Sequence, residues 1–271
     1  MAVHVPGLLL FGALAALAPV AALAAEPYAT DWTQGAKSQA RLIAARPDLA
    51  ALEIRLAPGA ITYWRDPGDA GVPPVFDTSG SSNVATVEPV FPAPKRIREA
   101  DGSEAFAYEG AVVLPLRVTL ADPAKPATLA IDARFGVCEK ICLPARAKLS
   151  LALPAAAAST PHAATIEAAL AAAPRPVPAA AFGAIESAGV DAWRFCAAHE
   201  PGPARDLFVE PPLGWWITSA PTPDDGGRDC FKLTLRQQPK DADPPVDLRL
   251  TLTGGAGPVE AKVTAPAPKL Q

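Results

Sequence analysis

The 271-residue sequence has little of what several classes of protein require. It has a single methionine, at position 1, only three histidines, and a formal net charge of −4. Nucleic-acid-binding domains normally carry a basic surface, so we expect no nucleic-acid partner. After the first 25 residues, no segment approaches the roughly 20 uninterrupted apolar residues of a membrane-spanning helix. The mature chain is therefore expected to be soluble.

Residues 1–25 are apolar and alanine-rich, and they end in Ala22-Leu23-Ala24. This A-x-A pattern predicts a secretory signal peptide. Its start is atypical because it has His4 but no lysine or arginine, so a retained anchor is the alternative. The apolar run is short for a bilayer, however, which favours cleavage. Export and an even number of cysteines, four, fit an oxidising compartment, and we expect a periplasmic protein.

The composition predicts an all-β protein. Thirty-two prolines and few long helical periods are typical of loop-rich β domains. Residues 26–155 contain short alternating segments separated by turns, as in a β-sandwich. Residues 156–180 are rich in Ala and Pro and predict a semi-rigid linker, with a weakly helical piece at 163–173 and a solvated His162. A second β-sandwich is expected over residues 181–268.

Two of the cysteines, Cys138 and Cys142, lie between two alternating runs, residues 129–135 and 149–153. The alternation predicts a hairpin with the cysteines at its tip. Full extension would hold their Cα atoms about 13 Å apart, beyond the ~7 Å limit for a disulfide, so the chain must turn between them. Gly136 and Pro144 suit such a turn.

The role of a Cys138–Cys142 disulfide is left open by its spacing. A ring this small stabilises a fold by only about 2 kcal/mol, and pairing Cys196 with Cys230 gives nearly twice that. Short exposed disulfides exchange readily, which favours a redox role, whereas a small structural bridge is the alternative. Zinc is a weak third possibility, because no further cysteine pair or histidine lies near in sequence.

Three segments carry a family resemblance: Phe135–Ala145 (FGVCEKICLPA), Thr62–Gly71 (TYWRDPGDAG) and Tyr108–Leu116 (YEGAVVLPL). In this order they resemble the amino-terminal periplasmic domain of the disulfide reductase DsbD and its relative ScsB, which shares the short CxxxC spacing. The second unit resembles the second half of ScsB amino-terminal regions more loosely. The resemblance implies two immunoglobulin-like domains and thiol–disulfide exchange at Cys138 and Cys142, with no cofactor and no metal.

The resemblance also implies supporting residues. Tyr63 and Trp64 fall where the family places aromatic side chains beside the cysteines, although ordinary core packing is the alternative. Pro144 follows the second cysteine. Family members shield the cysteines with a cap loop bearing an aromatic residue; here the corresponding stretch, residues 98–106, offers only Phe106. Either Phe106 serves as the cap or the cap is absent.

The charges near the cysteines bear on their reactivity, because the thiolate is the nucleophile. Lys140 and Arg146 would favour the thiolate, and Glu139 would oppose it. The chain lacks the membrane and thioredoxin-like domains of DsbD, so the expected partners are exported thioredoxin-like proteins and a DsbD-like membrane electron donor.

Cys196 and Cys230 are expected to form a structural disulfide that pins the two sheets of the second domain. A second redox site is the alternative. His199, near Cys196, is weak evidence for a catalytic Cys–His pair because the following Pro201-Gly202-Pro203 marks a loop. Trp215 and Trp216 are either core residues or an exposed patch.

Two rivals to an exchange function remain. The first is a non-catalytic exported binding module with two structural disulfides, because a fold alone does not fix a function. The second is copper handling by the reduced cysteines, which are soft ligands.

Overall fold

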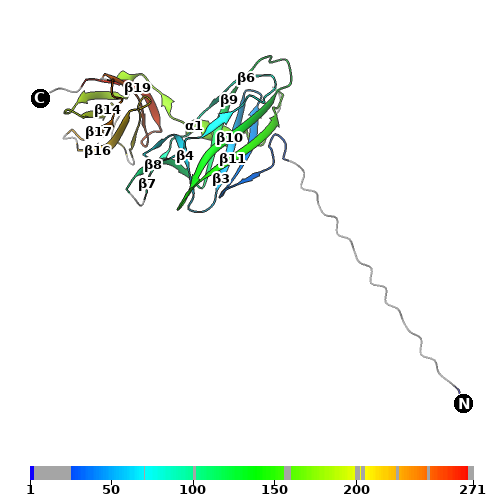
Figure 1. Cartoon of the computed structure of the whole chain (residues 1–271). Helices are drawn as coiled ribbons and strands as arrows, with labels where there is room; N and C mark the ends of the chain where they lie inside the picture. Colours follow the sequence, from blue (N-terminus) through cyan, green and yellow to red (C-terminus); the bar gives the residue numbers. More distant parts are fainter. Residues whose placement is uncertain are drawn as a thin grey trace.

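The computed structural model describes residues 1–2, 26–69, 71–99, 102–155, 160–198, 202, 205–223, 226–242 and 245–267. The chain is almost entirely β and forms two immunoglobulin-like sandwiches, joined through a short helical segment (Figure 1). The expected signal peptide falls almost wholly outside these residues, and so does His199. Among the described residues, no helix is long and apolar enough to cross a membrane.

The first domain is built from two facing sheets. One has the strand order β1-β2-β3-β9-β6 and the other β11-β10-β4-β8-β7, with β5 paired to β10. Their bounds are β1 Thr33–Gly35, β2 Ser38–Arg46, β3 Leu49–Leu56, β4 Ile61–Gly68, β5 Val75–Asp77, β6 Val84–Pro89, β7 Lys95–Arg98, β8 Glu104–Glu109, β9 Ala111–Leu120, β10 Thr128–Cys138 and β11 Cys142–Ala152.

The predicted alternation in the cysteine hairpin is confirmed. Leu129, Ile131 and Phe135 of β10 and Leu149 and Leu151 of β11 are all buried in one core. A proline within a strand usually marks an edge or a bulge, but Pro115 stands in an inner strand. It lies in β9, between β3 and β6, opposite Ala51. The strand tolerates it because the β6 pairing ends at Leu116, one residue away.

The segment expected to be a linker is packed against both domains. The helix α1 (Ala163–Ala171) covers the outer face of β2 and β3, where Ile166 is buried among Ile43, Leu49 and neighbouring alanines. The strand β12 (Arg175–Pro176) pairs with β19, and α2 (Ala179–Phe182) buries Phe182 in the second core. His162, expected to be solvated, is only 6% exposed. Composition predicted a semi-rigid linker with a weakly helical piece at 163–173. The helix is present, and burial of these few apolar side chains fixes the segment against the two domains.

The second domain pairs the sheet β12-β19-β18-β15 with the sheet β13-β14-β17-β16. The bounds are β13 Gly183–Ser187, β14 Ala192–Ala197, β15 Leu207–Glu210, β16 Trp216–Thr222, β17 Cys230–Gln237, β18 Val246–Leu252 and β19 Val259–Ala265. Its core contains alternating side chains of β14, β17 and β18, namely Trp193, Phe195, Phe231, Leu233, Leu248, Leu250 and Leu252.

The Cys196–Cys230 disulfide is present, but its expected position between two sheets is wrong. The two residues lie directly opposite one another in β14 and β17, which are neighbours in one sheet. Both cysteines are buried. The bridge therefore fixes the register of one strand pair and does not link the two layers.

Candidate redox site

The cysteine hairpin brings Cys138 and Cys142 together as the sequence predicts. They are opposite residues at the end of the β10–β11 ladder, and they form a disulfide across the turn of residues 139–141. Gly136 and Pro144 are not in that turn. They face each other two residue pairs further along the ladder, inside the two strands.

The two cysteines differ in their access to solvent. Cys138 is 4% exposed and packs with Ile61, Tyr63 and the alanines of β8, whereas Cys142 is exposed. Between them, the side chain of Ile141 is 66% exposed at the tip. A reactant arriving from solvent therefore meets Cys142 first.

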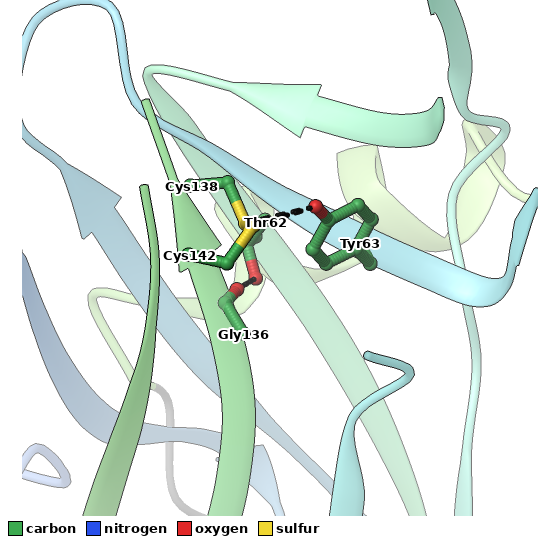
Figure 2. Close-up of a disulfide and its surroundings, with 5 residues drawn as sticks. All are labelled: Thr62, Tyr63, Gly136, Cys138 and Cys142. Carbon is green, nitrogen blue, oxygen red and sulfur yellow. Dashed lines mark hydrogen bonds between the residues drawn. A yellow bond between two sulfur atoms is a disulfide. The ribbon is translucent and has the colours of Figure 1, made fainter. Parts of the chain in front are cut away.

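Tyr63 is the polar side chain that reaches the sulfurs. Its hydroxyl donates a hydrogen bond to Cys138 Sγ at 2.8 Å and lies 3.4 Å from Cys142 Sγ (Figure 2). The neighbouring Thr62 hydroxyl donates to the Gly136 carbonyl at 2.8 Å, which ties β4 to β10 beside the disulfide (Figure 2). Burial raises the pKa of the Tyr63 hydroxyl, and the nearby Glu99 carboxylate adds to the shift, so the phenol keeps its proton at neutral pH.

Two glycines make room for the Tyr63 ring. A Cβ atom on Gly71 would lie 2.5 Å from Cε1 of the ring, and one on Gly136 would lie 3.2 Å from Cδ2 and Cε2. A real Cβ atom essentially never approaches as closely as 2.5 Å, so Gly71 has to be a glycine if the ring is to keep its place. At Gly136 the contact is less severe, and the Tyr63 ring would have to shift by a few tenths of an ångström to admit a Cβ atom.

The charged residues of the hairpin are mostly paired with each other. Glu139 forms an ion pair with Lys37, and the hydrogen bond from Lys37 lowers the pKa of that carboxyl group. Arg146 donates to both oxygens of Asp132 and lowers the pKa of the aspartate to about 2. Arg146 is therefore held on Asp132, four residues along β11 from Cys142. Lys140, exposed in the turn, is the cation nearest to the cysteines in the sequence.

Trp64 and Phe106 are not placed beside the cysteines. Adjacent residues of a strand point to opposite faces, so Trp64 turns away from the face that carries Tyr63. Trp64 and Phe106 belong to the sandwich core, and both contact Phe208 of the second domain, with ring centroids 5.8 Å and 4.9 Å away. Of the four supporting residues, the structure brings Tyr63 to the sulfurs and sets Pro144 two residues beyond Cys142 on the exposed side of β11.

Sequence reasoning missed Phe208. The run Leu207-Phe208-Val209 contained a usable signal, because three consecutive apolar residues in a strand indicate burial on both faces. Trp216, in contrast, is 45% exposed and donates its indole N–H to Asp69 of the first domain. Trp215 packs partly buried against the second core.

Two immunoglobulin-like sandwiches, the first with a disulfide across the tip of a surface hairpin, define the class of fold to which the protein belongs. The sequence profile of the family described as thiol:disulfide interchange protein DsbD, N-terminal, matches residues 33–154. This first domain belongs to the DsbD amino-terminal domain family.

The fold of both domains has a counterpart among solved structures. The crystal structure of the N-terminal periplasmic domain of ScsB from Proteus mirabilis aligns with a TM-score of 0.70 and 19% sequence identity. The alignment covers 89% of this chain and 100% of that one, so the similarity of fold extends to the second domain. Comparison with curated protein sequences gave no match.

Proposed function

We propose that this protein is a periplasmic thiol–disulfide exchange module that passes electron pairs between exported partners through Cys138 and Cys142. The observation that carries the proposal is the asymmetry of the disulfide. Cys142 is exposed, whereas Cys138 is buried and its sulfur accepts a hydrogen bond from the Tyr63 hydroxyl. Exchange requires one sulfur that a thiolate can attack and one that can leave, and these two positions suit the two roles.

In the oxidised state, a partner thiolate attacks Cys142 Sγ. The new sulfur–sulfur bond forms as the Cys138–Cys142 bond breaks, and Cys138 Sγ takes the bonding pair and leaves as a thiolate. The Tyr63 hydroxyl, already donating to this sulfur, stabilises the charge. A second thiolate of the partner then attacks the partner's sulfur in the mixed disulfide and releases Cys142 as a thiolate. The partner is oxidised by two electrons and the hairpin is reduced by two.

The reduced hairpin runs the same steps in reverse with an oxidised partner. Cys142 attacks the partner's disulfide, and Cys138 resolves the mixed disulfide that results. Membership of the DsbD amino-terminal family supports a thiol–disulfide pathway in general. As the particular partners we propose exported thioredoxin-like proteins on one side and a DsbD-like membrane electron donor on the other.

The test is covalent trapping in the periplasm. Cys138→Ser removes the resolving thiol, so we expect Cys142 to hold its partner in a discrete higher-mass species that dithiothreitol dissolves. Cys142→Ser removes the attacking thiol and should trap nothing. Non-reducing electrophoresis and mass spectrometry of the trapped species identify the partner.

The matched control is the double variant Cys196→Ser/Cys230→Ser, which should lose stability but trap no protein. Trapping by Cys142→Ser alone would reverse the assigned roles. If neither hairpin variant captures a protein when a DsbD-like donor is present, the exchange function is wrong. A reduction potential below about −300 mV for the Cys138–Cys142 pair would then favour the non-catalytic binding module.

A further inference from the structure

One side chain of the second domain completes the core of the first. In β15, Leu207 and Val209 point into their own sandwich, while Phe208, on the opposite face, belongs to the core of the first domain and is 1% exposed. Its ring meets Trp64 and Phe106 edge-on. The edge strand β15 is therefore buried on both faces, one by each domain.

An arginine of β4 ties the two domains together beside this ring. Arg65 donates from Nε and Nη2 to both oxygens of Glu210, at 2.8 and 2.7 Å, and from Nη2 to Glu260 at 2.6 Å. Its guanidinium also stacks 4.5 Å from the centroid of the Trp64 ring. A fork-to-fork pair of this kind fixes direction as well as distance.

An arginine of β7 does the same on the other side of Phe208. Arg96 donates to both oxygens of Asp206 at 2.9 Å, to the Leu207 carbonyl at 2.8 Å and to the Ser219 hydroxyl at 3.0 Å. It lies 5.0 Å from the centroid of Phe106 and 5.3 Å from that of Phe208. The carboxylates at 206 and 210 thus bracket Phe208 in sequence, and the two arginines hold both of them.

The strands that receive Phe208 also carry the redox site on their other face. In β4, Trp64 contacts Phe208 and its neighbour Tyr63 contacts the sulfurs. In β8, Phe106 contacts Phe208, whereas Ala105 and Ala107 pack in the buried cluster that holds Tyr63 and Cys138. β4 and β8 are hydrogen-bonded neighbours. A displacement of this strand pair at Phe208 would displace Tyr63 from Cys138.

We propose that the second domain acts as the support of the redox site, and that Phe208 is a positioning residue which holds Tyr63 on Cys138 Sγ through Trp64 and Phe106. This inference rests on the proposed exchange function and gives the second domain a role in it. The Tyr63 hydrogen bond stabilises a thiolate more than a disulfide sulfur, so it favours the reduced hairpin. Loosening the support should therefore make the disulfide harder to reduce.

The experiment measures the glutathione equilibrium constant of the Cys138–Cys142 disulfide in the full-length protein, by alkylation and peptide mass. Tyr63→Phe removes the hydroxyl and should shift the constant about tenfold toward the disulfide, roughly 30 mV for a two-electron couple. Phe208→Ala should shift it in the same direction by about threefold or more. Phe208→Leu, which keeps most of the apolar volume, should give a smaller shift and covers the case in which Phe208→Ala does not fold.

The double variant Tyr63→Phe/Phe208→Ala decides whether Phe208 acts through Tyr63. If it does, the double variant should match Tyr63→Phe alone, because no hydroxyl remains to be displaced. The matched control is Phe195→Leu in the core of the second domain, which should lower the melting temperature without moving the constant.

The proposal is overturned if neither Phe208 variant moves the constant, if Phe195→Leu moves it equally, or if the shifts of Tyr63→Phe and Phe208→Ala simply add. The trapping assay with Cys138→Ser scores exchange separately. If the glutathione equilibrium constant is unchanged in the Phe208 variants, only the positioning role is refuted. If no partner is trapped, the exchange function itself is refuted.

Discussion

Asp66 shows how a single residue near the domain interface responds to pH. Partial burial raises the pKa of its carboxyl group to about 6 from an ordinary value of 3.8, against the opposing hydrogen bond from the Gly68 N–H. The folded state binds this proton more tightly than the unfolded chain does. The contribution of Asp66 protonation to the free energy of unfolding is therefore complete below pH ~4 and is lost as the pH rises through about 6.

Asp66→Asn tests this effect. Asparagine keeps an oxygen that can accept the Gly68 N–H but carries no charge, so the variant should melt at a higher temperature than the wild type at pH 7.5. The difference should vanish near pH 3.5. Thermal unfolding at both values checks it, with the exposed Asp77→Asn as control. The pKa of Asp77 is lowered by the Ser79 N–H, so the opposite sign is expected there. A lower melting temperature for Asp66→Asn at pH 7.5 would contradict the argument.

The residues of the site were partly predictable from sequence. The motif around Cys138 and Cys142 identified the disulfide, and the aromatic pair at 63–64 identified a side chain that reaches it. The motif alone could not decide whether Tyr63 or Trp64 reaches the sulfurs, because it does not say which face of the strand each residue occupies. Only the pairing of β4 with β10 shows that Tyr63 takes the sulfur side and Trp64 the core side.

The two disulfides differ in their position within the strands and in their access to solvent. Cys138–Cys142 closes a hairpin tip and leaves Cys142 exposed, whereas Cys196–Cys230 joins two buried positions of inner strands. Reduction begins with attack on an accessible sulfur, so mild dithiothreitol should open the hairpin disulfide well before the other. Alkylation followed by intact mass should show two labels first, at Cys138 and Cys142. Labelling of all four cysteines at the same rate would count against a distinct role for the hairpin.

The elements themselves were predictable where alternation was regular. The hairpin β10–β11 and the core strands of the second domain follow the period of two, because each buries one face. The segment between the domains was not predictable in the same way. Its Ala and Pro content predicts a semi-rigid linker with a weakly helical piece, and Ile166 alone does not reveal that β2 and β3 offer it an apolar surface.

We expect the two domains to unfold as one unit because of the contacts around Phe208. The interface places an aromatic ring and two arginines, Arg65 and Arg96, in partly buried surroundings. Removing one partner of such an ion pair costs about 3–5 kcal/mol, because the remaining charges stay unpaired. Calorimetry of the wild type should therefore show a single thermal transition.

Arg65→Met should separate that transition into two, because Glu210 and Glu260 would both lose the arginine with which they are paired. The control is Arg236→Met, on the exposed side of β17, whose arginine donates to Thr218 within the second domain and should leave one transition. Two well-resolved transitions in the wild type would show that the interface is weaker than its contacts indicate. The composition of the chain does not predict this interface, because the interface depends on one strand, β15, whose two faces pack into different cores.

The double burial of β15 also limits how this protein can change by recombination. A gene rearrangement that replaced the second sandwich with an unrelated one would leave a vacancy between Trp64 and Phe106. It would also leave Arg65 without its two acids and Arg96 without Asp206. A viable substitute would need an aromatic residue flanked by carboxylates at the same spacing as Asp206, Phe208 and Glu210. The two halves are therefore expected to be inherited together, as a single heritable unit.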